Sequence, residues 1–173
     1  MPMASTNSST KRSKPRAGAK TSSEASKKAD AIKLLKDDHR EVKTWFNQYE
    51  KLEDEAEKEA LAQKICAALT VHAKIEEEIF YPALRKNIDD EELLDEAEVE
   101  HASAKQLIAE ILSMSPQDQL FDAKVKVLGE YVLHHVQEEE QEMFPEARES
   151  EVDLEALGAK LSKRKAELMK KAA

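Results

Sequence analysis

The chain has 173 residues, enough for one compact domain, and its 3 glycines and 5 prolines are too few for the turns of an all-β fold. The formal net charge of −9 is unevenly divided: residues 1–28 carry seven Lys or Arg and one Glu, about +6, which leaves about −15 for the remainder. This acidic body lacks the cationic face that sustained contact with nucleic acid or an anionic membrane requires.

Residues 1–28 are rich in Ser, Thr and Lys and contain almost no large apolar side chains. Such a segment cannot offset the entropy of ordering, so we predict a disordered basic tail. A non-specific nucleic-acid-binding or partner-binding arm and a transit peptide are the alternatives, although the apolar face of a transit peptide is missing. With no membrane-spanning run and no secretory signal, we expect a cytoplasmic protein without membrane contact.

Beyond the tail, apolar residues recur at helical spacing in four stretches of roughly 20 to 30 residues. We predict breaks near residues 53–55, 87–90 and 113–116. At the third break, Ser115 is expected to cap the next helix and Pro116 to occupy its first position.

Connections this short join antiparallel neighbours, so the predicted fold class is all-α, an antiparallel up-down-up-down four-helix bundle spanning residues 29–150. Residues 151–173 are predicted to form an extra C-terminal helix that packs on the bundle or extends from it. Cys66, the single cysteine, cannot form an intrachain disulfide and is expected in the core.

The chain contains an internal repeat. HAKIEEEIFYP at residues 72–82 resembles HVQEEEQEMFP at residues 135–145, an offset of 63 residues. His39 and His101, which precede the two copies, are separated by 62 residues. The sequence therefore predicts two similar helical hairpins.

Each copy places a histidine and a glutamate on one helix face. His72 with Glu76, and His135 with Glu139, are four residues apart, about 6 Å along a helix axis. This face is the apolar one in both helices. A carboxylate directed into a bundle core is costly unless it is paired or bound to a cation, so the pattern favours a metal site.

His39 and His101 also fall on apolar stripes, so each helix directs one histidine inward. Imidazole and carboxylate donors without thiolate suit iron or manganese, and zinc less closely. Six donors exceed the needs of one tetrahedral ion, which indicates two metal ions. The predicted metal ligands are His39, His72, Glu76, His101, His135 and Glu139.

This order of ligands, with phenylalanine and proline after each glutamate cluster, resembles the hemerythrin-like (HHE cation-binding) domain family over residues 32–147. The resemblance implies two iron ions in an oxo- or hydroxo-bridged centre, in a stand-alone cytoplasmic domain. It also implies reversible binding of dioxygen, or a response to oxygen, nitric oxide, peroxide or iron.

The sequence departs from the oxygen-carrying hemerythrins at one position. Those proteins have a second histidine four residues after the third-helix histidine, and here that residue is Lys105. The departure argues against simple oxygen carriage. We therefore expect a di-iron protein that binds or senses its ligand without turnover, and the alternative is a di-iron oxidase, either a ferroxidase or a peroxide-consuming enzyme.

Two residues near the motifs have alternative interpretations. His134 lies five residues before Glu139, a spacing that the oxygen carriers also use, although the repeat favours His135. Glu98 forms a Glu-x-x-His pair with His101 and is interpreted either as an extra metal-binding carboxylate or as a solvated surface group.

Four more residues have roles that the sequence leaves open. Glu77 and Glu140 follow the predicted ligands and are expected to support them or to be solvated. Tyr81 and Tyr131 are expected either to flank the site or to belong to the core.

Overall fold

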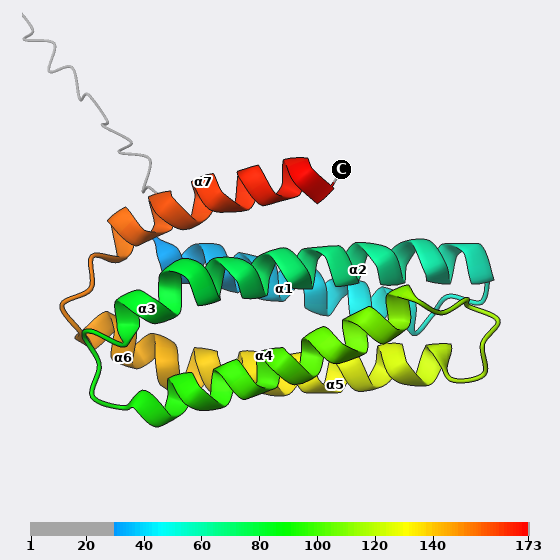
Figure 1. The fold of residues 1–173 in the computed structure, drawn as a ribbon, viewed down its shortest axis with the longest axis horizontal. Helices are drawn as coiled ribbons and strands as arrows, with labels where there is room; N and C mark the ends of the chain where they lie inside the picture. The colour runs from blue at the N-terminus through cyan, green and yellow to red at the C-terminus, as the bar shows by residue number, and fades with distance from the viewer. Residues whose placement is uncertain (1–29, 173) are drawn as a thin grey trace, which may run out of the picture.

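The computed structural model describes residues 30–172, and every secondary-structure element in this range is helical (Figure 1). The all-α prediction is confirmed. The predicted disordered tail, residues 1–28, lies outside the described residues. No helix within residues 30–172 is long and apolar enough to cross a membrane.

Five long helices account for most of the described chain. They are α1 (Ala31–Tyr49), α2 (Glu55–Ile75), α4 (Glu91–Leu112), α5 (Phe121–Glu138) and α7 (Leu154–Ala172). Four short segments extend two of them: α2 continues through the π-helical segment η1 (Glu76–Phe80) into α3 (Tyr81–Leu84), and α5 continues through the π-helical segment η2 (Glu139–Met143) into α6 (Phe144–Glu149).

The four helices α1, α2, α4 and α5 enclose the core. Contacts join α1 to α2, α2 to α4, α4 to α5 and α5 back to α1. Their connections alternate between the two ends of the molecule (Figure 1). The helix α7 lies outside this ring, against α1, α2 and η1.

Aspartate side chains begin four of the five long helices, including α7, where Asp153 accepts a hydrogen bond from a backbone N–H at 2.9 Å. Asp30, Asp54 and Asp90 each accept a hydrogen bond from a backbone N–H in the first turn of α1, α2 and α4, respectively. The breaks predicted near residues 53–55 and 87–90 are therefore confirmed.

The prediction for the start of the fourth helix was wrong. Ser115 and Pro116 lie in a turn, where the backbone N–H of Ser115 donates to the Asp118 carboxylate at 2.8 Å and the N–H of Asp118 donates to the Ser115 carbonyl at 2.9 Å. These bonds close a turn before the helix. The helix α5 instead begins at Phe121, whose ring is buried.

The core consists of two apolar clusters. One cluster contains residues of α3, α6 and α7 together with the neighbouring ends of α1, α2 and α4, and the other fills the opposite half of the ring. Cys66 belongs to the second cluster, where burial raises the pKa of its thiol to about 11, in agreement with its predicted core position. Along all four helices of the ring, the predicted ligand histidines fall between the two clusters.

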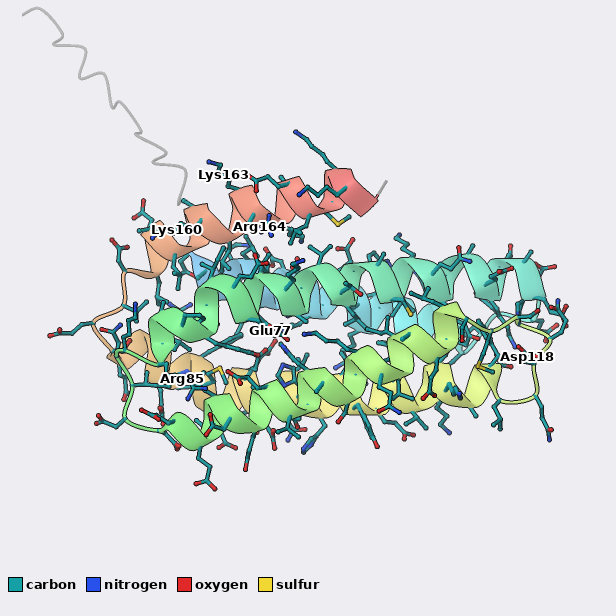
Figure 2. The ribbon with its side chains drawn as sticks, viewed as in Figure 1. Glu77, Arg85, Asp118, Lys160, Lys163 and Arg164 are labelled. Carbon is teal, nitrogen blue, oxygen red and sulfur yellow. The ribbon has the colours of Figure 1, made fainter. Side chains whose placement is uncertain are left out.

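The helix α7 is anchored by apolar and ionic contacts. Leu157 and Leu161 are buried in the first cluster. Arg164, labelled in Figure 2, donates to both carboxylate oxygens of Glu78 at 2.6 and 3.1 Å. The anchoring to Glu78 connects α7 to η1.

Leu161→Ala is expected to lower the free energy of unfolding by about 2–5 kcal/mol, because Leu161 is fully buried and its removal leaves a cavity. Urea unfolding followed by circular dichroism measures this loss. Leu112→Ala is the control, since Leu112 is 55% exposed and a change within about 0.5 kcal/mol is expected. Equal losses in the two variants would show that α7 is not anchored through Leu161.

Candidate metal centre

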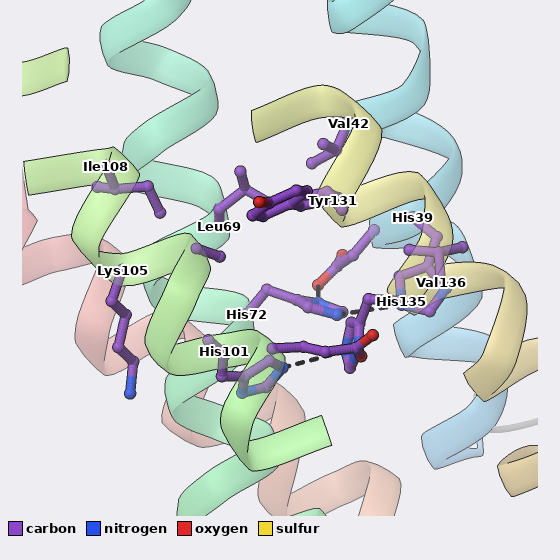
Figure 3. Close-up of a pocket in the computed structure, with 15 residues that line it drawn as sticks. His39, Val42, Leu69, His72, His101, Lys105, Ile108, Tyr131, His135 and Val136 are labelled. Carbon is purple, nitrogen blue, oxygen red and sulfur yellow. Dashed lines mark hydrogen bonds and ion pairs between the residues drawn. The ribbon is translucent and has the colours of Figure 1, made fainter. Parts of the chain in front are cut away.

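The structure brings all six predicted ligands together in one buried group. None of the six is more than 8% exposed, although all carry polar or ionisable side chains. The four histidines come from the four helices of the ring and converge beside a cavity (Figure 3).

The histidines form two similar pairs. In the first, the Nε2 atoms of His39 and His72 are 3.1 Å apart, and in the second, the Nε2 atoms of His101 and His135 are also 3.1 Å apart. Both pairs have an interplanar angle of 64°. The internal repeat of the sequence is therefore reproduced as two matching halves of the site.

The glutamates connect the two pairs. Glu76 Oε1 is 3.0 Å from His72 Nε2, and its Oε2 is 3.3 Å from His101 Nε2. Glu139 Oε2 is 3.2 Å from His39 Nε2. Among the described residues, Glu76 Oε1 and Glu139 Oε2 are buried without a hydrogen-bond partner. A cation between these oxygens and the imidazole nitrogens would compensate for that desolvation, so the donor set fits a metal.

Both glutamates begin π-helical segments. The wider turn closes when the backbone N–H of Tyr81 donates to the Glu76 carbonyl and that of Phe144 donates to the Glu139 carbonyl, each five residues later. The proline that follows each of these aromatic residues lacks an N–H for the ordinary helical bond. Such π-bulges are frequent at functional sites. The sequence interpretation missed them, although the prolines ten residues after His72 and His135 were a signal.

Each histidine also faces a carboxylate on its other side. A protonated Nδ1 donates to this carboxylate, which orients the ring and leaves the Nε2 lone pair for a metal. The pairs are His39 with Glu140 at 3.0 Å, His72 with Asp38 at 3.3 Å, His101 with Glu77 at 2.9 Å and His135 with Glu100 at 2.7 Å.

Two of these supporting carboxylates were missed in the sequence. Asp38 and Glu100 directly precede His39 and His101, and this repeated acidic residue could have identified them. Glu77 and Glu140 were predicted to support the ligands or to be solvated, and their contacts favour the first interpretation. Glu77 is directed into the space between η1 and α4 (Figure 2).

Lys105 binds a carboxylate and points away from the four histidines (Figure 3). Its Nζ donates to both oxygens of Glu77 at 2.6 Å, and Glu77 in turn accepts from His101. The lysine at the position of the extra histidine in oxygen carriers therefore fixes a supporting carboxylate.

The two halves of the site differ at one aromatic position. Tyr81 is buried, and its hydroxyl donates to Glu139 Oε1 at 2.9 Å and lies 3.2 Å from His101 Nε2. Phe144, at the equivalent position of the other half, stacks on His39 with ring centroids 5.8 Å apart. Tyr81 therefore flanks the site, whereas its counterpart offers no hydroxyl.

Two other sequence alternatives lie at the surface. The His134 side chain is 65% exposed, away from the buried group that contains His135. The Glu98 side chain is 56% exposed and pairs with Arg85 at 3.1 Å. Neither is brought into the buried group, so the structure favours His135 over His134 and the solvated interpretation of Glu98.

A cavity of about 50 Å³ lies beside the histidines (Figure 3). Its apolar lining includes Val42, Leu69, Ile108 and Val132. Tyr131, which is 51% exposed, extends this lining to the surface. A cavity this small has room for a ligand of a few atoms, since one water occupies about 30 Å³ of the liquid.

The sequence matches the hemerythrin HHE cation binding domain over residues 30–147. The chain belongs to this family. It has the hemerythrin-like fold, which is also the fold in the crystal structure of a hemerythrin HHE cation binding domain-containing protein from Mycobacterium kansasii. The two superpose with a TM-score of 0.73 at 24% identity, covering 83% of this chain and 89% of the other.

A curated relative from a Nostoc species is named "DNA nickase". It is 30% identical over 118 residues, which cover 66% of this chain and 32% of the relative. The HHE chain therefore spans about a third of the length of that protein.

Charge coupling in the HHE site favours the protonated forms of His72 and His135 when metal is absent. Burial opposes the charged imidazolium of His72, but Glu76, Asp38 and Glu139 outweigh it and raise the pKa of His72 to about 10. Burial likewise opposes the charge on His135, and its neighbouring carboxylates raise that pKa to about 9. Metal binding therefore has to displace protons from the site.

The metal-free protein is expected to lose stability as pH rises from 6.5 to about 10. A raised imidazole pKa in the folded state stabilises the protein fully below the ordinary value of 6.5, and this contribution disappears as pH passes through about 10 at His72. Thermal unfolding of the metal-free chain at several pH values measures the effect. His72→Gln is the comparison variant, in which the pH dependence should be weaker. If the stability of His72→Gln fell as steeply with pH as that of the wild type, the raised pKa of His72 would not be the cause.

Proposed function

We propose that this chain is a non-haem di-iron binding protein that binds or senses oxygen, nitric oxide, peroxide or iron. The position of Glu76 carries the proposal, because its two oxygens face different histidine pairs and Oε1 is buried without a hydrogen-bond partner among the described residues. An antiparallel up-down-up-down four-helix bundle provides this position, with one histidine from each helix.

The donor atoms form two groups that share Glu76. The potential metal-binding groups are His39, His72, Glu76 and Glu139 for one ion, and Glu76, His101 and His135 for the other. Nitrogen and carboxylate oxygen donors without thiolate favour iron or manganese, and zinc can occupy the same donors less favourably. Two ions are therefore a better match than one.

The residues of the chain determine what reaches the centre. Four carboxylates hold the imidazole rings, and the Tyr81 hydroxyl holds one oxygen of Glu139 so that its Oε2 faces His39. The apolar cavity admits a diatomic molecule or peroxide more readily than an organic substrate, because its volume is about 50 Å³. Two bound iron ions would supply a redox-active pair that binds such a ligand.

A di-iron oxidase, either a ferroxidase or a peroxide-consuming enzyme, is the second candidate. Glu76 and Glu139 at the centre, with one imidazole fewer than in oxygen carriers, favour this alternative, since carboxylate donors stabilise oxidised iron. The buried Tyr81 hydroxyl is also a hydrogen-bond donor within the site. Ligand binding or sensing stays the leading proposal, because a cavity of about 50 Å³ beside the histidines accounts for it without turnover.

The name of the Nostoc relative raises DNA cleavage as a further activity to test. The buried position of the six ligands argues against it, because a phosphodiester of duplex DNA cannot enter a cavity of about 50 Å³. Conversion of supercoiled plasmid to the open circle by the metal-loaded chain would contradict this inference.

Glu76→Gln and Glu139→Gln are each expected to reduce iron from about two ions per chain to below one, and to remove the increase in melting temperature on iron loading. The amide of Gln is a weaker metal ligand than the carboxylate of Glu, and it carries no negative charge to balance the charge of the ion. Metal analysis of the purified protein and thermal unfolding measure the two effects. Glu130→Gln, an exposed change on α5, is the control and should retain full iron.

A wild-type chain with normal helicity and less than half an iron ion per chain, after iron-replete loading, would contradict the di-iron proposal. Optical spectra then separate the two candidates. Reversible bands on adding and removing oxygen or nitric oxide are expected for binding or sensing, whereas steady loss of peroxide over many turnovers would favour the enzyme.

A further inference from the structure

His134, which the buried site does not use, lies in a second group of potential metal-binding residues. Its Nε2 is 3.1 Å from Glu138 Oε1 on α5 and 3.7 Å from Glu100 Oε1 on α4. Donor atoms of the three residues all lie within 4.8 Å of one another. One imidazole and two carboxylates therefore converge on the surface from two helices.

These three residues line an acidic surface groove of about 510 Å³ between α4 and α5, which we call the α4–α5 groove. Along it, the structure describes five carboxylates and no Lys or Arg. Asp95 is paired with Arg85 at 2.9 Å from outside the groove. Clefts lined by one sign of charge concentrate ions of the opposite sign, so the groove attracts cations. Its lining residues are Glu92, Asp95, Glu96, Val99, Glu100, His134 and Glu138.

The groove adjoins the buried centre through Glu100. While Oε1 of Glu100 faces His134, its Oε2 accepts from His135 Nδ1 at 2.7 Å. A gap of about 10 Å³ is lined both by Glu100 and Glu138 of the groove and by His135 and Glu139 of the centre. Glu139 is 1% exposed and has a buried oxygen without a hydrogen-bond partner among the described residues. A carboxylate of the buried centre therefore borders the same small gap as two carboxylates of the groove.

The other half of the molecule lacks this arrangement. By the internal repeat, the residues equivalent to His134 and Glu138 are Val71 and Ile75, which are buried and apolar. The residue equivalent to Glu100 is Asp38, which pairs with Lys165 of α7. The surface group is thus confined to one side of the two-fold repeat, and its members His134 and Glu138 are not required for holding a histidine of the centre.

We propose that Glu100, His134 and Glu138 form a surface site that captures a divalent metal cation on its way to the buried centre. The proposal rests on the proposed di-iron function of that centre. One nitrogen and two carboxylates leave several positions to water, so the ion is bound weakly and exchanges readily. Transfer inward exchanges ligands and displaces protons, without oxidation or reduction.

Cobalt(II) is a suitable probe because it is coloured, divalent and accepts the same donors. The full chain with its buried centre loaded is expected to bind one further cobalt ion in a calorimetric titration. The double variant His134→Gln with Glu138→Gln should lose this ion. Glu130→Gln, which removes one negative charge from the same helix, is the control and should retain it.

The rate of loading tests the route. After rapid mixing of the metal-free chain with cobalt(II), the double variant is expected to fill the buried centre about tenfold more slowly than the wild type. The final occupancy of the buried centre and the melting temperature should be unchanged. Glu130→Gln should load at nearly the wild-type rate.

Two results would overturn the proposal: a loaded wild-type chain that binds no further cobalt, or a double variant that loads as fast as the wild type. If the buried residues bind no metal, the experiment gives a different result. A metal-free chain that binds a single cobalt ion, lost in the double variant, would contradict the di-iron function and leave the surface site in place.

Discussion

Two carboxylates buried in an apolar core, Glu76 and Glu139, are the constraint on which the rest of the structure depends. Each is at most 1% exposed, and each has one oxygen without a hydrogen-bond partner among the described residues. Desolvation of this kind is tolerated only beside positive charge. Imidazolium groups supply that charge when metal is absent, which explains the raised pKa values of His72 and His135, and metal ions replace their protons.

Charge alternates outward from this centre. The four histidines surround the glutamates, and Asp38, Glu77, Glu100 and Glu140 face the histidines from outside. Lys105 and Lys165 then bind Glu77 and Asp38. Lys165 belongs to α7, beyond the part of the chain that matches the HHE family, so the C-terminal helix contributes to one of these layers. The site is therefore held by contacts that extend to the surface.

The sequence was sufficient to predict the helices and the group of six buried residues, because helical spacing and the repeat depend on residues close together in the chain. It was insufficient for contacts between helices, such as those of Asp38 with His72 and Glu100 with His135. It also missed the π-helical segments, which add a residue to one turn, and the turn at Asp118 that delays α5. These features depend on tertiary packing and on backbone hydrogen bonds that hydrophobic periodicity does not report.

The aromatic difference between the halves makes the two ion positions chemically distinct. Tyr81 places a hydroxyl near His101, whereas Phe144 stacks on His39 and offers only a hydrocarbon face. The donor groups also differ, with four residues around one position and three around the other, so two ions held there would have unequal surroundings. Two metal ions held by these residues would therefore differ in affinity and in reduction potential. The repeat thus supplies two positions, and the uneven sharing of Glu139 together with the Tyr81 hydroxyl breaks their equivalence.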